Sequence, residues 1–422
     1  MRASRLCRPI AAFALCVGIG AASSAAPPSL DDLVAAALRT NPEVVGAKQK
    51  VDEAKARVAE MVAQRKWQVS LSGTVSGSSG EVAEPPEMQS FGTAEASLNF
   101  LIPNTAKAGA QVEQAVAQLA AAQAALRGAQ FDVAFQTRQA CIELRRARDA
   151  RSIADDNLAD ALRQEEDTRK RIAAGDVPEA DLLKAEVPVA QDRAAFAKAE
   201  SGVKAAEKTL NSLLQRELDA PIELPSLPRE ALSKLDVRDA VSQALAHSPD
   251  ALQARAALAG TLAGLRVARH GRDPDLSFQA GYLATGDPTA YSTQGTLGLT
   301  VSLPIFDGGT VSAQVKQAEA QVAQAQTALK AALQQVRLEV EQAILDVQAD
   351  AASAEAGRQV EDVARRSLDK ARQAYAAGLT TTRDVLDAQL VYAQARVDAN
   401  SAQYDLDVAR AHLRQLLGGE KP

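Results

Sequence analysis

The stretch YAAGLTTTRDVLDAQ, residues 375–389, has an earlier counterpart in RIAAGDVPEADLLKAE, residues 171–186. Each contains an Ala-Ala-Gly turn, and the two glycines, Gly175 and Gly378, lie 203 residues apart. Glycine is typical of a helix C-terminus that needs a residue in the left-handed conformation. The two stretches therefore predict two helical hairpins, each reversing direction at its glycine.

The same offset of 203 residues relates long stretches on both sides of the two turns. A series of apolar residues in steps of seven precedes each turn and predicts a coiled-coil seam: Val112, Leu119, Leu126, Val133 and Ala140, then Val315, Val322, Leu329, Val336 and Ala343. The duplication predicts a first repeat over 27–218, a proline-rich linker over 219–230, a second repeat over 231–418 and a tail over 419–422.

Each repeat predicts the same elements in the same order. A short helix comes first (31–39 and 237–246), and a polar residue followed by proline then starts a helix that ends near residue 66 or 270. After two strands, a helix without internal proline runs over about 107–174 and 311–377, on the order of 100 Å long. The returning helix ends at Leu214 or Leu417, and Pro188 should kink the first of these.

Two pairs of segments have a period of two and predict four strands with one apolar face. Strands of about ten residues with this pattern suit either a transmembrane β-barrel or a soluble sandwich with one buried face. Five aromatic residues at or near the strand ends favour a membrane interface: Trp67, Phe91, Phe100, Tyr282 and Tyr291. Four strands cannot close a barrel, and a membrane does not tolerate open strand edges, so a membrane barrel would require oligomers; a trimer would supply twelve strands.

Composition narrows the class of protein. The first 26 residues predict a signal peptide that carries two of the three cysteines, so that only Cys141 remains and no internal disulfide is possible. The formal net charge of -6 and the 3% aromatic content argue against nucleic-acid binding.

The chain has no phosphate-binding loop, paired-cysteine motif or metal-binding histidine pattern, so we expect no enzyme, cofactor or metal. Charged pairs on the long helices are expected to be solvated, with partners on the same helix.

The duplicated plan, and the residues Tyr375-x-x-Gly378 followed by Asp384-Val-Leu-Asp387-Ala, resemble the TolC family of outer-membrane efflux and secretion ducts. The resemblance covers about residues 29–417. It implies an α+β membrane protein, in which long antiparallel helical hairpins form a periplasmic tunnel and a homotrimer shares a twelve-stranded transmembrane β-barrel. It also implies docking to a periplasmic adaptor protein and an inner-membrane transporter, in an outer membrane with a large periplasmic part.

The resemblance assigns roles to residues near the second turn. Asp384 and Asp387 lie on one helix face, and in the family the matching pair forms rings of carboxylates around the entrance. Crowding of these charges would raise their pKa values and bind cations. The alternative is that Asp384 stabilises the helix start beside Thr381 and Thr382, while Asp387 is solvated surface.

The resemblance also implies polar contacts that hold the entrance closed. Asp181 and Tyr375 match the family, whereas Thr380 and Ala180 stand where an arginine and a threonine are expected. The gate would then be looser, or it would be closed by other residues such as Arg383 or Lys184. Gly175 and Gly378 would form the periplasmic tip that meets the partner proteins.

The function that these features predict is an outer-membrane channel of a tripartite efflux or type I secretion system. The rival is a periplasmic adaptor or structural coiled-coil protein without a membrane barrel. Such a protein would not need two alternating hairpins at matching places in both repeats. No pattern in the sequence indicates whether such a channel would carry drugs, metals or proteins.

Overall fold

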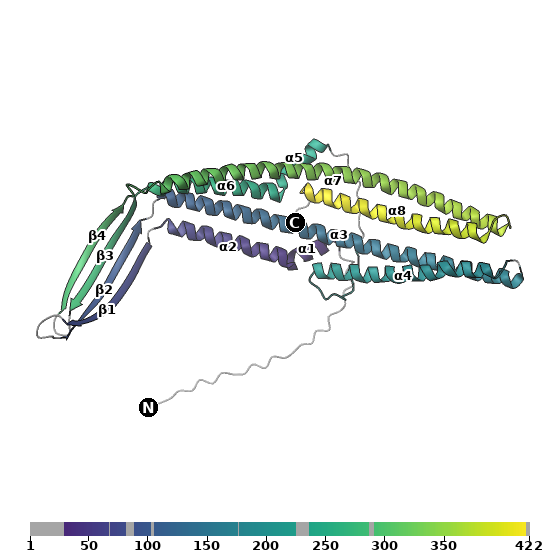
Figure 1. The fold of residues 1–422 in the computed structure, drawn as a ribbon, viewed down its shortest axis with the longest axis horizontal. Helices are drawn as coiled ribbons and strands as arrows, with labels where there is room; N and C mark the ends of the chain where they lie inside the picture. The colour runs from purple at the N-terminus through teal and green to yellow at the C-terminus, as the bar shows by residue number, and fades with distance from the viewer. Residues whose placement is uncertain are drawn as a thin grey trace, which may run out of the picture.

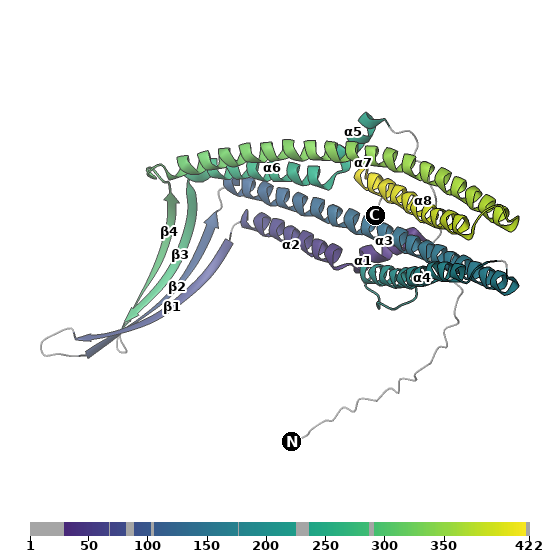
Figure 2. The same ribbon diagram turned by 45° about the vertical axis from the view of Figure 1, so that its right-hand side comes forward.

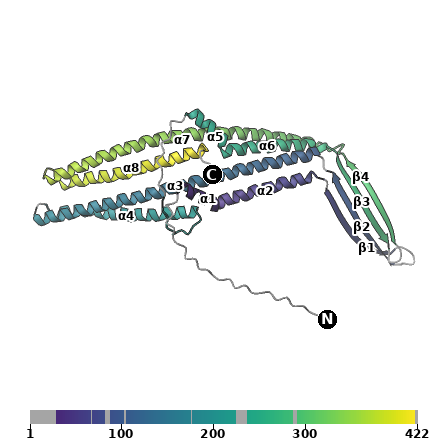
Figure 3. The same ribbon diagram turned by 180° about the vertical axis from the view of Figure 1, so that it is seen from behind.

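The computed structural model describes residues 29–66, 68–81, 88–102, 105–175, 177–224, 236–286 and 291–418. The predicted signal peptide, Trp67, residues 225–230 of the predicted linker and the tail lie outside these ranges. The chain is elongated, with a β-sheet at one end and two helical hairpins reaching the other (Figure 1). The helical bundle between them is seen from a second angle in Figure 2 and from behind in Figure 3.

The two halves of the chain contain the same elements in the same order. The first half consists of α1 (Leu30–Thr40), α2 (Pro42–Gln64), β1 (Gln68–Glu81), β2 (Met88–Ile102), α3 (Thr105–Ala174) and α4 (Ala180–Leu213). The second half consists of α5 (Val237–His247), α6 (Pro249–Arg269), the short 3-10 helix η1 (His270–Arg272), β3 (Asp275–Gly286), β4 (Tyr291–Ser302), α7 (Thr310–Ala376) and α8 (Thr382–Leu416).

Local sequence explains where the helices begin. Asn41 and Ser248 cap α2 and α6, because the side chain of each accepts a hydrogen bond from a backbone N–H of the first turn. A proline follows each cap at the first helical position, where its missing N–H costs nothing. Pro188 lies inside α4, but the helix continues through it without interruption.

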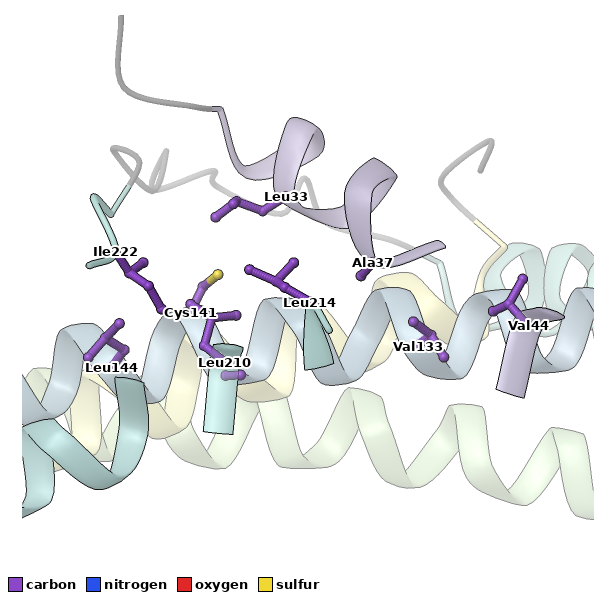
Figure 4. Close-up of a cluster of buried hydrophobic side chains, with 10 residues drawn as sticks. Leu33, Ala37, Val44, Val133, Cys141, Leu144, Leu210, Leu214 and Ile222 are labelled. Atoms are coloured by element: carbon purple, nitrogen blue, oxygen red, sulfur yellow. The ribbon is translucent and has the colours of Figure 1, made fainter. Parts of the chain in front are cut away.

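The hydrophobic core lies on the seam between the long helices. In the first half, the buried α3 residues Val133, Ala140 and Leu144 pack against α4 and against α1 (Figure 4). The second half packs in the same way, since Val336, Val340 and Ala343 of α7 join α8 and α5. Of the predicted seam residues, Val133, Ala140, Val322, Val336 and Ala343 are therefore buried in the core, whereas Val112 and Leu119 are only partly buried.

The end of the first half is folded back onto the helices rather than extended. The fully buried side chain of Asn211 donates hydrogen bonds to the backbone oxygens of Leu218 and Ala220, at 3.0 and 2.8 Å. Arg148 of α3 donates to the oxygen of Ile222 at 2.9 Å. These contacts hold the first part of the predicted linker against α3 and α4.

The four strands form one antiparallel sheet in the order β1-β2-β3-β4. Its register places Leu71, Leu98, Ala280 and Leu297 in one row across the sheet, while the neighbouring row contains serine, glycine and threonine. The strands have 14, 15, 12 and 12 residues, longer than the expected ten or so. The extra length in the first hairpin is rich in serine and glycine. These residues pair through their backbone groups, so they extend the strands without the apolar alternation that predicts a strand from the sequence.

The apolar face of the sheet is uncovered in the single chain. Leu297 is 79% exposed, and Leu71, Val75 and Leu299 are exposed with it. The helices continue from one end of the sheet and do not lie across this face (Figures 1 and 2). A sandwich with a second sheet is therefore not what the described part of the chain forms.

Candidate entrance at the tips of the helical hairpins

Both glycine turns lie at the end of the molecule opposite the sheet (Figures 1 and 3). Gly175 has φ +80° and Gly378 has φ +72°, which is the left-handed region that favours glycine. After α7, the N–H of Leu379 donates to the oxygen of Ala374 at 2.9 Å and that of Gly378 to the oxygen of Tyr375 at 3.0 Å. These bonds satisfy carbonyl groups at the end of α7, so that the turn is a defined structure.

Asp384 is part of the cap that begins α8. Its Oδ2 accepts hydrogen bonds from the hydroxyls of Thr380 and Thr381, both at 2.6 Å, and from the N–H of Thr381 at 2.9 Å. Thr381 in turn accepts from the N–H of Asp384 at 3.4 Å, which completes a capping box. The hydrogen bonds from Thr380 and Thr381 lower the pKa of Asp384 to about 2.

Asp387 lies one turn further along α8 and is largely exposed. Its only described charged partner is Arg383, with Nε 3.7 Å from Oδ2 in an i,i+4 pair. Asp384 in the single chain thus has the helix-start geometry, and Asp387 has the geometry of a solvated surface residue. The ring of carboxylates requires neighbouring chains and stays a prediction.

Tyr375 joins the two hairpins through a partner that the sequence did not single out. The guanidinium carbon of Arg171 lies 4.1 Å from the centre of the Tyr375 ring, and the hydroxyl is 3.1 Å from that of Thr382. Asp181, the other expected gate residue, instead binds Lys184 of its own helix at 2.8 Å. The contact between hairpins at the tip is therefore a cation–π pair.

Within the part of the chain that the structure describes, neither of the alternative gate residues bridges the hairpins. Lys184 binds Asp181 and Arg383 binds Asp387, each on its own helix. Arg171 was missed because the resemblance assigns it no role and it lies 204 residues from Tyr375 in the sequence. It precedes Gly175 by four positions, as Tyr375 precedes Gly378 by three.

Several polar contacts connect α3 to the second hairpin along its length, and we call four of them the inter-hairpin ladder. They are Arg146–Asp405 at 3.1 Å, Asp149–Tyr404 at 2.5 Å, Asp156–Arg396 at 2.9 Å and Asp160–Arg372 at 3.1 Å. Burial, and then the hydrogen bond to Asp149, raise the pKa of Tyr404 to about 12. The expectation that charges on the long helices pair only within their own helix was thus wrong for these four contacts.

The predicted membrane-interface aromatics are distributed over the sheet. Phe91 and Phe100 belong to β2 and Tyr291 is the first residue of β4. Tyr282 is exposed but lies inside β3, four residues before its end. Trp67 lies outside the described residues.

Two exposed apolar residues after β4 were also missed. Ile305 and Phe306 are 94% and 90% exposed. In the turn that follows them, the carboxylate of Asp307 accepts hydrogen bonds from the N–H groups of Gly309 and Val311 and from Arg272. Nothing in the sequence at this place distinguished exposed from buried apolar residues.

Two further observations concern ligands and membrane helices. Among the described residues, no three histidine, cysteine or acidic side chains are grouped closely enough to hold a metal ion. Cys141 is buried, and the burial raises its pKa to about 12. None of the helices in the described ranges combines the length and the apolar character needed to cross a bilayer.

Comparison with known proteins gives the same picture. The family model for the outer membrane efflux protein matches residues 33–215 and 240–419. The cobalt-zinc-cadmium resistance protein CzcC of Cupriavidus metallidurans is 28% identical over 239 residues, which are 54% of this chain and 54% of CzcC. Nodulation protein T of Rhizobium leguminosarum is 24% identical over 301 residues, 69% of this chain and 64% of the relative. The chain thus matches between about half and two thirds of the length of these relatives.

Solved structures share the fold over nearly the whole chain. CusC is 21% identical and covers 93% of both chains with a TM-score of 0.83. The outer-membrane channel OprN is 22% identical over 93% of this chain and 90% of its own, with a TM-score of 0.81. VceC of Vibrio cholerae is 22% identical over 92% and 96%, with a TM-score of 0.79. The family match spans both halves of the sequence, and this chain belongs to the outer membrane efflux protein family, the family of TolC-type ducts.

Proposed function

We propose that this chain is the outer-membrane channel of a tripartite efflux or type I secretion system. Three copies would share a twelve-stranded barrel in the outer membrane, and their helices would continue it as a tunnel through the periplasm. A periplasmic adaptor protein and an inner-membrane transporter would meet the channel at the turns of Gly175 and Gly378. The family membership supports the efflux channel, and the assembly and its partners are our proposal.

The observation that carries this function is the uncovered apolar face of the sheet. The cross-strand partners Leu98, Ala280 and Leu297 are all apolar, and Leu297 is 79% exposed. In water such a face would favour aggregation. In a bilayer it matches the hydrocarbon core, provided that the free edges of β1 and β4 pair with other chains.

The tips would then form the entrance from the periplasm. At 1.5 Å per residue, the 70 residues of α3 separate the sheet from the tip by on the order of 100 Å. We propose that Asp384 and Asp387 line this entrance as rings of carboxylates. Such rings would favour cations and bind divalent ions.

Single-channel recording in planar bilayers tests this function. The purified protein is compared with the double variant Asp384→Ala and Asp387→Ala, and with the matched control Asp52→Ala and Glu60→Ala, which removes two carboxylates from α2. We expect small, cation-selective currents that divalent ions block, and the block should be lost only in the tip variant. Channels indifferent to the tip variant would eliminate the rings but keep the channel. A protein that never inserts would favour the rival, a periplasmic adaptor or structural coiled-coil protein.

A further inference from the structure

A cavity lies where α1 meets the end of α8, on the surface of α3 (Figures 1 and 3). Its volume is about 370 Å³, within the range of pockets that hold small organic molecules. Both halves of the chain contribute to it, and its lining residues include Asp31, Phe131, Arg138 and Arg414. We call it the α1 cavity, and it is separate from the sheet and from the glycine turns.

Two arginines converge on the α1 cavity. Arg138 of α3 and Arg414 of α8 both line it, and Asp31 of α1 is the one acidic residue among its described lining. The side chain of Arg138 is 13% exposed and that of Asp31 is 88% exposed, with Nη2 and Oδ1 3.8 Å apart. Solvent screens the charge of so exposed a carboxylate, so the described lining of the cavity is positive.

The two arginines are also close enough to repel each other. Burial lowers the pKa of Arg138, the charge of Asp31 opposes this shift, and the positive charge of Arg414 adds to it. An anion between the two guanidinium groups would offset this repulsion. A guanidinium group is planar and presents paired N–H donors, a geometry that fits the two oxygens of a carboxylate.

The remaining walls of the α1 cavity are largely apolar. Phe131 and Phe135 lie one turn apart on α3, and Val34 and Leu38 of α1 face the same space. Aromatic and aliphatic walls bind an apolar group because they remove its surface from water. The cavity thus combines a cationic part with walls that suit a planar ring or a short alkyl chain.

The fold does not require these residues, because the second repeat is built without them. By the offset of 203 residues, Phe131 and Arg138 correspond to Gln334 and Glu341 of α7, and Arg414 corresponds to Asn211 of α4. The seam of α7 nevertheless packs against α8 and α5 in an apolar core. The arginines and the phenylalanine therefore belong to this cavity and not to the duplicated core.

We propose that the α1 cavity binds a small amphipathic carboxylate, with the carboxylate held between Arg138 and Arg414 and the apolar body against Phe131 and Phe135. This site is additional to the channel and does not depend on it. The ligand contacts α1, α3 and α8 at the same time. Its binding therefore holds α1 and the second hairpin against α3 and stiffens the bundle between the sheet and the tips.

Isothermal titration calorimetry of the detergent-purified protein with naphthoate, an aromatic carboxylate, tests this site. The neutral probe is naphthalenemethanol, which has the same rings without the carboxylate, and all solutions are matched in detergent. We expect saturable binding of naphthoate. The alcohol should bind at least about tenfold more weakly, since hydrogen bonds between charged groups are lost. Added salt should weaken the binding of naphthoate.

Variants distinguish the two arginines from a general effect of charge. Arg414→Asn introduces the residue found at the matching position of the first repeat, so the variant should fold, and it should weaken naphthoate binding by about tenfold. Arg138→Gln should have the same effect. The matched control, Arg57→Gln with Arg65→Gln, removes two exposed arginines from α2 and should leave the affinity unchanged.

Hydrogen exchange locates the ligand. With saturating naphthoate, the amides of α1 and of residues 130–138 should exchange more slowly, and those of the sheet should not change. Equal affinity of naphthoate for the wild type and Arg414→Asn, or equal affinity of the acid and the alcohol, would refute the carboxylate site. Protection confined to the sheet would contradict it as well. None of these measurements uses conductance, so a failure here leaves the proposed channel standing.

Discussion

Arg396 of α8 and Asp156 of α3 form an ion pair with Nη2 and Oδ2 2.9 Å apart, although 240 residues separate them in the sequence. The pair belongs to the inter-hairpin ladder and holds the second hairpin against the first. It explains why the α3–α8 surface can be polar and still pack closely.

The ladder should contribute modestly to holding the hairpins together. Asp156→Asn is expected to weaken the pair by about 0.5 kcal/mol, since it is partly exposed. Hydrogen exchange of α8 should accelerate accordingly, and 1 M salt should abolish the difference. The double variant Asp156→Arg and Arg396→Asp swaps the two charges, and it should restore the protection of the α8 amides against hydrogen exchange. Equal exchange in all three proteins would show that the pair contributes nothing.

Removing the α8 cap should open the tip locally. Thr381→Ala removes the hydroxyl that accepts from the N–H of Asp384, and loss of such a cap costs about 1 kcal/mol. The amides of the first turn of α8 should exchange faster by roughly fivefold, while those of α3 do not change. Thr381→Ser keeps the hydroxyl and serves as the control. Unchanged exchange in Thr381→Ala would mean that the hydrogen bonds of Asp384 to the Thr380 hydroxyl and to the backbone N–H of residue 381 suffice to maintain the helix start.

The pH dependence of this cap has a defined sign. The pKa of Asp384 is lowered from 3.8 to about 2 in the folded chain. Its contribution is therefore fully present above pH 3.8 and is lost as the pH falls toward 2. Between pH 5 and 8, exchange at the start of α8, corrected for its intrinsic pH dependence, should stay constant. A titration of this segment near neutral pH would instead indicate that neighbouring carboxylates in the oligomer raise the pKa.

The Arg171–Tyr375 pair should help to hold the tips closed. Arg171→Gln removes the cation, for which an exposed pair contributes about 0.5 to 1 kcal/mol, and should raise the mean conductance in bilayers. Tyr375→Phe keeps the ring and loses only the bond to Thr382, so its effect should be smaller. If Tyr375→Phe opens the channel more than Arg171→Gln, the hydroxyl and not the ring is the contact that matters.

A positive charge introduced on one face of the sheet should impair membrane insertion more than the same charge on the other face. Leu297→Arg places a cation on the exposed apolar face, which costs about 2 to 4 kcal/mol near the middle of a bilayer. Thr296→Arg places it on the opposite, polar face and should leave insertion nearly unchanged. Folding into lipid vesicles, followed by protease protection, measures both variants. Equal insertion would contradict a lipid-facing position for Leu297.

The periodicity of the sequence predicted the helices, the strands and their order well. The steps of seven through Val133 and Val336 identified the packed seam, and the cap-proline pairs at Asn41 and Ser248 identified helix starts. These signals are local, since they depend on residues close together in the chain. The strand ends were less accurate, because serine and glycine pair in a ladder without any apolar pattern.

The contacts of the tip could not be predicted in this way. The Arg171–Tyr375 pair joins residues 204 positions apart, and the approach of the two hairpins decides it. The same is true of Asp156 and Asp160, which look like solvated residues in the sequence. A pairing rule within one helix cannot indicate that a second helix lies alongside.

The inter-hairpin ladder also suggests an order of events in the folding of the chain. The ionic surface on α3 forms within one chain and can do so in water, before any other copy is met. Its partners lie on both helices of the second hairpin, since Arg372 belongs to α7 and Arg396 to α8. A newly made chain would thus bring its own two hairpins together first, and assembly with other copies would be a later, concentration-dependent step.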